Sequence, residues 1–318
     1  MKCLSLFSGI GGFDIALEKQ NHTIIGACEI DQYARSVYAR HFPNIKIYED
    51  ATRINPKDLP DFDMLCAGFP CQAFSIAGKR LGFNDTRGNL FYEIARIAKE
   101  KKPEYLLLEN VKGLLNHDNG KTFIEIINTL DEIGYNIQWQ VINSKYFLPQ
   151  NRERIYIIGH FREKSKRKIL HIESNSETND KERKLIKVGN VDTKGHNSLW
   201  GRVYDPKAIS STINANGGGL GGKTGLYAIP TLTPDRINKR QMGRRFKTKD
   251  EPAFTITSQD RHGVMIGNRI RRLTPLECER LQGFPDNWTI GLSDAQRYKC
   301  CGNAVTVPVV EFILKNLI

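Results

Sequence analysis

The sequence predicts an α/β protein, in which a doubly wound, mostly parallel sheet is joined to a second, smaller, irregular β-rich domain. Apolar β-type runs alternate with helical patterns from the N-terminus to about residue 159. This order places helices on both faces of a parallel sheet. From about residue 188 to residue 268 the chain is instead rich in Gly, Thr, Asn and Arg, with short β-like runs. A helical pattern returns at residue 273.

The elements of the first domain follow one another at short intervals. Apolar runs predict strands at residues 3–7, 23–29, 45–48, 64–67, 105–109, 138–143 and 155–158. Helical patterns predict helices at residues 11–19, 32–41, 90–101 and 121–133, with two more at residues 273–281 and 305–317. Ligands of such sheets bind beyond the carboxyl ends of the strands. The residues that follow each strand are therefore the first candidates for a functional site.

The length of 318 residues allows one large domain with one smaller domain. Residues 162–184 are polar, highly charged and aperiodic, which is typical of a linker or insertion. We expect a catalytic and cofactor-binding domain from residues 1–187 and 301–318. Residues 188–270 form the second domain, and residues 271–300 connect the two.

Composition excludes several classes of protein. With 40% hydrophobic and 26% charged residues, the chain is globular rather than disordered or collagen-like. No apolar run approaches the ~20 residues that span a bilayer, and the N-terminus reaches glycine too early for a signal peptide. We therefore expect a cytoplasmic protein. Seven cysteines without a CxxC pair argue against a disulfide framework and against a metal site.

The net charge of +12 is concentrated in one part of the chain. Residues 201–272 hold 14 basic and 5 acidic side chains, whereas residues 1–200 hold 29 and 25. The densest stretch, residues 236–249, has seven basic residues and no acidic one. Such a block is often only a solvated face, but it is also typical of a surface that binds a phosphate backbone. Charge alone does not separate DNA from RNA.

A glycine turn, FSGIGG at residues 7–12, follows the first strand and opens a helix. Glycines there let the backbone approach a ligand and leave helix N-terminal amides accessible. Glu29 follows the next strand about twenty residues later, where a carboxylate accepts hydrogen bonds from ribose hydroxyls, and Asp50 follows the strand after it. The combination predicts a nucleoside-bearing cofactor, either a dinucleotide or S-adenosylmethionine.

Three further motifs lie after strands and carry reactive side chains. Cys71 stands in a GFPCQ segment at residues 68–72, on a loop, and is the candidate nucleophile; Cys3, Cys28 and Cys66 lie in strands and are expected in the core. Glu109 ends an apolar strand, where partial burial raises a carboxyl pKa enough for proton donation. The third motif, QNRER at residues 150–154, places two arginines on one side of an extended segment. Such a pair suits phosphate or carbonyl binding, and a surface salt bridge is the alternative.

Together these blocks resemble the bacterial DNA (cytosine-5) methyltransferases of restriction-modification systems. The matching blocks are FSGIGG at residues 7–12, PCQ at 70–72, ENV at 109–111, QNRER at 150–154, RLTP at 272–275 continuing to RLQGFP at 280–285, and GNAV at 302–305. They occur in the family's order and span nearly the whole chain. One departure is Ser5, where many members carry Asp.

The resemblance implies a function and a mechanism. A methyl group passes from S-adenosylmethionine to carbon 5 of a cytosine flipped out of duplex DNA, leaving S-adenosylhomocysteine, with no metal. The Cys71 thiolate adds to carbon 6 of the base. Glu109 contacts N3 and the exocyclic amine, and Arg154, with Arg152 nearby, steadies the base carbonyl and the adduct. A monomer is expected, paired with a cognate restriction endonuclease without a stable complex.

The resemblance also assigns binding residues. For the cofactor these are Phe7, Ser8, Gly9, Gly11, Gly12, Glu29, Ile30, Asp50, Ala51, Pro70, Leu90, Asn303 and Ala304. For DNA, Gln72, Ser75 and Arg87 lie in a loop that closes over the duplex, and the second domain supplies Gly218, Gly219, Arg236, Arg240, Arg244 and Arg245. The glycine run at residues 217–225 resembles a recognition loop, although a plain flexible turn has the same composition.

Four other functions remain open at this point. An RNA cytosine methyltransferase shares the chemistry, and the large basic insertion argues for DNA. A thymidylate-synthase-type enzyme also uses a Pro-Cys nucleophile but acts on free nucleotides, for which a strongly basic domain is unnecessary. A NAD-dependent dehydrogenase explains the glycine turn and Glu29 but leaves Cys71, Glu109 and Arg154 without a role. A non-catalytic DNA-binding regulator does not explain the intact catalytic set.

Overall fold

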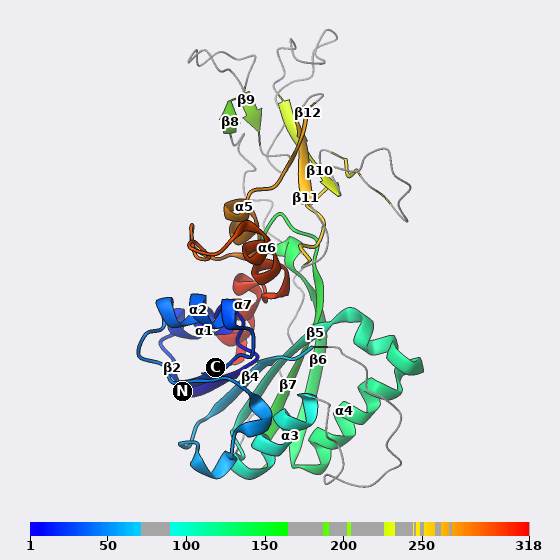
Figure 1. Cartoon of the computed structure of the whole chain (residues 1–318). Helices are drawn as coiled ribbons and strands as arrows, with labels where there is room; N and C mark the ends of the chain where they lie inside the picture. The colour runs from blue at the N-terminus through cyan, green and yellow to red at the C-terminus, as the bar shows by residue number, and fades with distance from the viewer. Residues whose placement is uncertain are drawn as a thin grey trace.

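A seven-stranded sheet forms the core of the larger domain (Figure 1). A computed structural model describes residues 1–70, 90–164, 187–190, 202–204, 226–232, 244, 246–248, 251–257, 262–266 and 269–317. The strands are β1 (Lys2–Leu6), β2 (Thr23–Cys28), β3 (Ile47–Tyr48), β4 (Met64–Gly68), β5 (Tyr105–Val111), β6 (Tyr135–Asn143) and β7 (Glu153–Phe161), in the order β3-β2-β1-β4-β5-β7-β6. Only β7 runs antiparallel to its neighbours, β5 and β6. The predicted mostly parallel sheet is confirmed.

Helices cover both faces of this sheet, as predicted (Figure 1). One face packs against α1 (Gly12–Lys19), α2 (Gln32–His41) and α7 (Val307–Leu317), and the other against α3 (Leu90–Lys101) and α4 (Lys121–Glu132). Strands β1, β4 and β5 are buried on both sides, because consecutive residues that point to opposite faces are fully inaccessible, namely Cys3 and Leu4, Leu65 and Cys66, and Leu106 and Leu107. This explains why these strands are continuous apolar runs rather than alternating ones.

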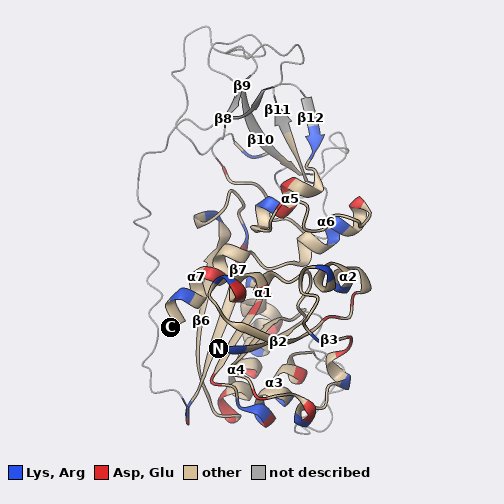
Figure 2. Ribbon diagram, turned by 90° about the vertical axis from the view of Figure 1, so that its left-hand side faces the viewer, with Lys and Arg blue, Asp and Glu red and all other residues tan. Residues whose placement is uncertain are grey.

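A second, five-stranded sheet stands apart from the first (Figure 2). It consists of β8 (Lys187–Asn190), β9 (Arg202–Tyr204), β10 (Leu226–Leu232), β11 (His262–Ile266) and β12 (Arg269–Arg272), in the order β12-β11-β10-β9-β8. Its pairs are antiparallel except for β9 with β10. The expected small β-rich domain is therefore present, and its last strand extends two residues beyond the expected boundary at residue 270.

Two helices lie between the sheets: α5 (Pro275–Gln282) and α6 (Asp294–Asn303) (Figure 2). Helix α5 begins with a capping box, because Thr274 Oγ1 accepts from the Glu277 amide and the Glu277 side chain accepts from the Thr274 amide. Helix α6 was not predicted from the sequence. Its residues are mostly polar, and burial is confined to Cys300, Cys301 and Gly302 at its C-terminal end, so no apolar stripe marks it.

Ser5, where many members of the family carry Asp, lies against the buried carboxyl group of Asp14. Both side chains are fully buried, and the Ser5 hydroxyl donates to Asp14 Oδ2 at 3.1 Å. Burial raises the pKa of Asp14 to about 7. An aspartate at position 5 would place a second carboxylate against this one, which is unfavourable in a low-dielectric interior. A hydroxyl donor at position 5 is therefore suited to Asp14 in this chain.

Candidate active site

The carboxyl ends of β1, β2, β4 and β5 meet at one edge of the sheet, and the predicted site residues follow them. Parallel pairing with a continuous register places Gly68 at the end of β4 opposite Glu109 on β5. Antiparallel pairing places Arg154 of β7 opposite Val111. Residues more than 40 positions apart in sequence thus share this edge.

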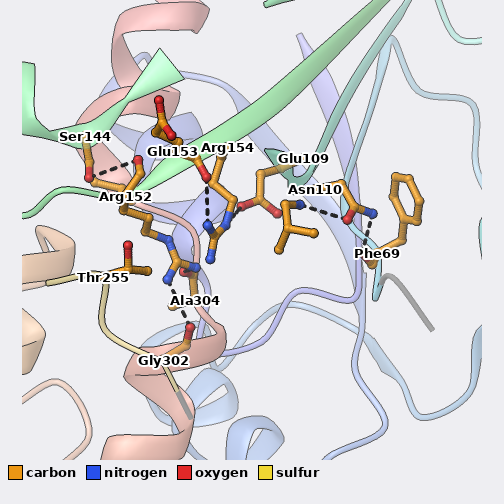
Figure 3. A network of polar contacts seen from close by, with 12 residues as sticks. Phe69, Glu109, Asn110, Ser144, Arg152, Glu153, Arg154, Thr255, Gly302 and Ala304 are labelled. Carbon is orange, nitrogen blue, oxygen red and sulfur yellow. Dashed lines mark hydrogen bonds and ion pairs between the residues drawn. The ribbon is translucent and has the colours of Figure 1, made fainter. Parts of the chain in front are cut away.

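Glu109 and Arg154 form a buried ion pair at this edge (Figure 3). Arg154 Nε lies 3.1 Å from Glu109 Oε1, and the two side chains are 16% and 10% exposed. Burial raises the pKa of Glu109, while the charges of Arg154 and Arg152 act in the opposite direction. A carboxyl group in this state holds its proton to a higher pH than a solvated one, which suits it to donate a hydrogen bond to a base.

Asn110 fixes the segment that leads to Cys71. Its side-chain amide donates to the Phe69 carbonyl at 2.9 Å, and its own amide oxygen accepts from the Val111 backbone at 2.8 Å (Figure 3). Pro70, which precedes Cys71, is exposed at the end of β4. Cys71 itself, with Gln72, Ser75 and Arg87, lies outside the described residues.

The other six cysteines are free and buried. Cys3, Cys28 and Cys66 lie in β1, β2 and β4, as the sequence predicted, and the remaining three are Cys278, Cys300 and Cys301. Burial raises the pKa of Cys3, Cys28, Cys278 and Cys300 to about 12, and that of Cys66 and Cys301 well above the ordinary value. A thiol with a raised pKa is a poor nucleophile at neutral pH, because the thiolate is the reactive form.

Arg152 lies beside the ion pair but is directed elsewhere (Figure 3). It is 3% exposed, and its two terminal nitrogens donate to the carbonyls of Ile256, Gly302 and Ala304 at 2.8, 3.2 and 2.8 Å. Burial lowers its pKa to about 10. Since both terminal nitrogens are committed to backbone carbonyls, this geometry does not support the expected contact between Arg152 and the base.

A cavity of about 290 Å³ opens next to Arg154. Its lining residues are Val111, Lys112, Gly113, Asn151, Glu153, Arg154 and Thr255. Lys112 pairs with Glu153 at 3.0 Å, and both side chains are about half exposed. The cavity therefore reaches Arg154 of the ion pair, and its wall carries Lys112 and Arg154 together with the acidic Glu153.

The glycine turn and Glu29 build the second half of the site. Gly9 has a φ of +56° and no atom within 4 Å of the position that a Cβ would occupy, so its backbone faces open space. Its amide donates to Glu29 Oε2 at 2.8 Å, and the Asp31 amide donates to Glu29 Oε1 at 2.8 Å. Each carboxylate oxygen retains a lone pair for a hydroxyl donor. Phe7 also has a positive φ, +53°, which is unusual for a bulky residue and typical of strained backbone at a binding turn.

Gly11, Gly12 and Ser8 support the turn through packing. A Cβ on Gly11 would lie 2.5 Å from the Phe42 ring, and one on Gly12 would lie 2.7 Å from Val305 Cγ2. The Ser8 hydroxyl donates to the Cys28 carbonyl at 3.4 Å. These three residues hold the turn against β2, α2 and the C-terminal segment, whereas Gly9 is the one that faces open space.

The contact between Gly12 and Val305 brings the C-terminal motif to the glycine turn. Asn303 and Ala304 precede Val305, and Asn303 is exposed at the end of α6. A Cβ on Gly68 would lie 3.6 Å from Val305 and 3.7 Å from Glu109 Oε2, so Val305 also lies near the ion pair. The three motifs thus form one continuous site.

A cavity of about 590 Å³ lies beside Glu29. It is lined by Ile30, Gln32, Arg35, Tyr48, Glu49, Asp50, Arg53 and Ile54. Ile30 is 71% exposed, and the Asp50 carboxylate accepts from the Thr52 amide and hydroxyl, which lowers its pKa. Ala51 is buried next to Asp50, and Leu90 begins α3. Ile30 offers apolar surface that fits an adenine ring, and the ionised Asp50 carboxylate offers an acceptor that fits the exocyclic amine of that ring.

The predicted DNA-binding residues of the second domain are mostly outside the described part of the chain, namely Gly218, Gly219, Arg236, Arg240 and Arg245. Arg244 is described, and it forms a forked pair with Glu251 at 2.8 and 2.6 Å. Within the described residues there is no cluster of His, Cys, Asp and Glu that could hold a metal ion. The same residues include no helix long and apolar enough to cross a membrane.

Two residues that support the site were not singled out from the sequence. Gln150 is fully buried and bonds both the Ile256 amide and the Leu281 carbonyl. Trp288 donates from its indole nitrogen to the Ile10 carbonyl at 2.8 Å and stacks on His41. The resemblance blocks included Gln150, but nothing in its spacing indicated which backbone groups it would reach.

The fold and the site define a class of protein: an α/β protein in which a glycine turn and a buried Glu–Arg pair lie at the carboxyl edge of a mostly parallel sheet. The chain belongs to the family of C-5 cytosine-specific DNA methylases, whose model matches residues 1–318. The predicted family is confirmed.

Several curated relatives are similar over the whole of this chain. The orphan methyltransferase M.SPRI of Bacillus phage SPR is 36% identical over an alignment that covers 100% of this chain and 97% of the relative. The type II methyltransferase M1.ScrFI of Lactococcus lactis subsp. cremoris is 39% identical, with 100% and 78% coverage. M.HhaI of Haemophilus parahaemolyticus, also type II, is 34% identical, with 100% and 94% coverage. The solved structure of the S. pombe Dnmt2 methyltransferase shares the fold, with a TM-score of 0.60, 19% identity and coverage of 100% and 98%.

Proposed function

We propose that this enzyme methylates carbon 5 of a cytosine in duplex DNA through a covalent adduct with Cys71. The observation that carries this proposal is the buried Arg154–Glu109 pair at the end of β5, beside the segment that leads to Cys71. The pair supplies a proton donor and a fixed cation at the place where a pyrimidine ring must be polarised. The six described cysteines are buried with raised pKa values, which leaves Cys71 as the candidate nucleophile.

In the proposed reaction the Cys71 thiolate forms a bond to carbon 6 of the base. Protonated Glu109 donates to N3, so the electron pair displaced from the 5,6 double bond is stabilised, and carbon 5 becomes nucleophilic. The Arg154 guanidinium steadies the base carbonyl. After methylation, loss of the carbon 5 proton returns the electron pair and expels the thiolate, which restores the double bond. Flipping the base out of the stack costs a few kcal/mol.

The proposed methyl donor is S-adenosylmethionine, which when bound supplies an electrophilic methyl group on a sulfonium. The residues present fit it: Glu29 retains acceptors for the ribose hydroxyls, and Asp50, whose Oδ1 accepts from the Thr52 amide, offers Oδ2 to the adenine amine. Gly9 leaves space for a close approach, and Ile30 and Phe7 offer apolar surface. The exposed Asn303 closes the site from the C-terminal side. No metal is needed for this chemistry.

We also propose that the β8–β12 sheet belongs to the target-recognition domain expected at residues 188–270, although its strands begin one residue earlier and end two residues later. We further propose that the enzyme acts as a cytoplasmic monomer. Relatives are named as orphan and as type II methyltransferases, so a paired endonuclease also stays a proposal. The DNA methyltransferases among the relatives favour DNA over RNA as substrate, and comparing methyl incorporation into duplex DNA and tRNA tests this.

Two experiments test the proposed reaction. Bisulfite sequencing of DNA from cells that express the enzyme should reveal one methylated cytosine in a short sequence. Duplex DNA that carries 5-fluorocytosine at that position should form a permanent adduct with the wild type, because fluorine does not leave as a proton does. Cys71→Ser should form none, whereas Cys300→Ala, which removes a buried thiol, should form as much as the wild type. An adduct of Cys71→Ser would disprove the assignment.

A further inference from the structure

Residues 251–257, which lie between β10 and β11 in the sequence, are attached to the segment that precedes β7. The Ala253 amide donates to the Pro149 carbonyl and the Asn151 amide donates to the Ala253 carbonyl, both at 2.8 Å. Residues 251–257 therefore run alongside the QNRER segment. These backbone hydrogen bonds link the segment that precedes β11 to the first domain.

Ile256 of this segment is bound on both of its backbone groups by side chains two positions apart. Its amide donates to Gln150 Oε1 at 2.7 Å, and its carbonyl accepts from Arg152 Nη1 at 2.8 Å. All three residues are at most 3% exposed. Because a buried polar group that loses its partner is strongly destabilising, Ile256 cannot shift unless both side chains follow it.

The same two side chains reach the C-terminal motif with their other atoms. Arg152 donates to the carbonyls of Gly302 and Ala304, the two residues that flank Asn303 (Figure 3). Gln150 donates to the Leu281 carbonyl and to Gln282 Oε1 at 2.7 and 3.3 Å. Gln282 in turn donates to the Cys301 carbonyl at 2.7 Å. One buried network thus joins Ile256, in the segment that precedes β11 of the recognition domain, to the turn that carries Asn303.

We propose that Gln150 and Arg152 are positioning residues that couple DNA binding by the recognition domain to the affinity of the cofactor pocket. The proposal rests on the proposed function, in which Asn303 closes the cofactor pocket and the second sheet binds DNA. A shift of Ile256 on DNA binding moves the Arg152 guanidinium and with it the carbonyls on both sides of Asn303. Coupling of this kind is reciprocal: the cofactor tightens DNA binding by the same factor by which DNA tightens cofactor binding.

The experiment measures the factor by which DNA tightens cofactor binding. The dissociation constant of S-adenosylhomocysteine is measured by calorimetry with and without a duplex that contains the methylated sequence, and the ratio is the coupling factor. We expect at least about a fivefold factor for the wild type. In Arg152→Lys the factor should fall towards one, because the donors of an ammonium sit on a single nitrogen and cannot reach carbonyls that two separate guanidinium nitrogens hold. Gln150→Glu, which keeps the acceptor for Ile256 but loses the donor to Leu281, should lower it in part.

A matched control is Arg162→Lys. Arg162 also donates to backbone carbonyls, those of Asp131 and Tyr135, at the far end of β7, and this substitution should leave the factor unchanged. A purely structural role for Arg152 would weaken both affinities and preserve their ratio. An unchanged ratio in both variants, or no coupling in the wild type, would overturn the proposal. Methyl transfer by the wild type on the same duplex reports separately on the proposed function.

Discussion

Arg154 Nε lies 3.1 Å from Glu109 Oε1 across the β5–β7 pairing, and both side chains are largely withdrawn from solvent. The carboxyl belongs to the parallel part of the sheet and the guanidinium to its antiparallel strand. Burial of the pair keeps the pKa of Glu109 above its ordinary value even though a cation adjoins it. The proton on Glu109 is therefore available for catalysis at a higher pH than on a solvated carboxyl.

The raised pKa of Glu109 predicts how the rate of methyl transfer depends on pH. If protonated Glu109 is required, kcat/KM falls as the pH rises through its raised pKa. Glu109→Gln should lower kcat by about 10²–10⁴-fold, and the descending limb should disappear, because an amide does not titrate. Methyl-transfer rates across the pH range, measured for both proteins, check this. A descending limb that persists in Glu109→Gln would assign it to another group.

Removing Arg154 should destabilise the protein in a pH-dependent way. Arg154→Ala leaves a buried carboxylate without its cation and should lower the free energy of unfolding at pH 8 by about 3 kcal/mol. At low pH the loss is smaller, because Glu109 is then protonated and needs no counter-charge. Lys19→Ala, which breaks an exposed pair with Glu311, should cost about 0.5 kcal/mol. Urea unfolding at both pH values measures these differences, and equal losses at the two pH values for Arg154→Ala would contradict the prediction.

The packing of Gly12 against Val305 predicts a rescue. Gly12→Ala places a methyl group 2.7 Å from Val305 Cγ2 and should displace the turn that carries Asn303, weakening S-adenosylhomocysteine binding about tenfold. Adding Val305→Ala removes the clashing methyl and should restore most of the affinity. Gly113→Ala is the control, because nothing lies within 4 Å of its Cβ position. Equal affinities of the single and double variants would show that Val305 does not transmit the change.

Asp14 should make the protein less stable as the pH rises. Its folded-state pKa is raised to about 7, whereas an unfolded aspartate ionises near 4. Between these values the unfolded state loses its proton first, so stability falls with pH until Asp14 also ionises and the deficit becomes constant.

Asp14→Asn removes this effect and keeps an acceptor for Ser5. It should raise the free energy of unfolding by roughly 2–4 kcal/mol at pH 8 and leave it unchanged at pH 4. Asp61→Asn is a control with the opposite sign. Lys101 lowers the pKa of the exposed Asp61, so removing that carboxylate should not raise the free energy of unfolding at pH 8. A difference in stability that is the same at both pH values would show that Asp14 does not titrate in this window.

The basic segment predicts the salt dependence of DNA binding. Replacing Arg236 and Arg240 by Gln should reduce the slope of log K against log salt by up to about 2, because each phosphate contact contributes ~0.9. Arg244→Gln should change the slope less than either of these, since Glu251 already pairs with Arg244. Binding isotherms at several KCl concentrations measure the slopes, and an unchanged slope in the double variant would exclude these two arginines from phosphate contact.

The sequence indicated the sheet edge and most of the candidate site residues because short local patterns in the chain mark them. Short apolar runs marked the buried strands, and Glu29 and Glu109 were found because each follows such a run. Helix α6 left no such signal, since its burial is confined to one end. The backbone carbonyls that Arg152 contacts were also not predicted, because spacing on an extended segment gives the side on which a residue lies but not the partner it reaches.

By itself, then, the sequence determined the fold class, the family and the chemistry available, since apolar periodicity and ordered motifs are properties of the chain alone. Only the tertiary structure decided how those groups are used. It paired Glu109 with Arg154, placed Val305 against Gly12 and directed Arg152 to the carbonyls beside Asn303. The physical reason is that ion pairs, packing contacts and buried hydrogen bonds depend on distances between residues that lie far apart in the sequence, some by 150 positions or more. The packing of the sheet and helices fixes these distances, and the local sequence does not.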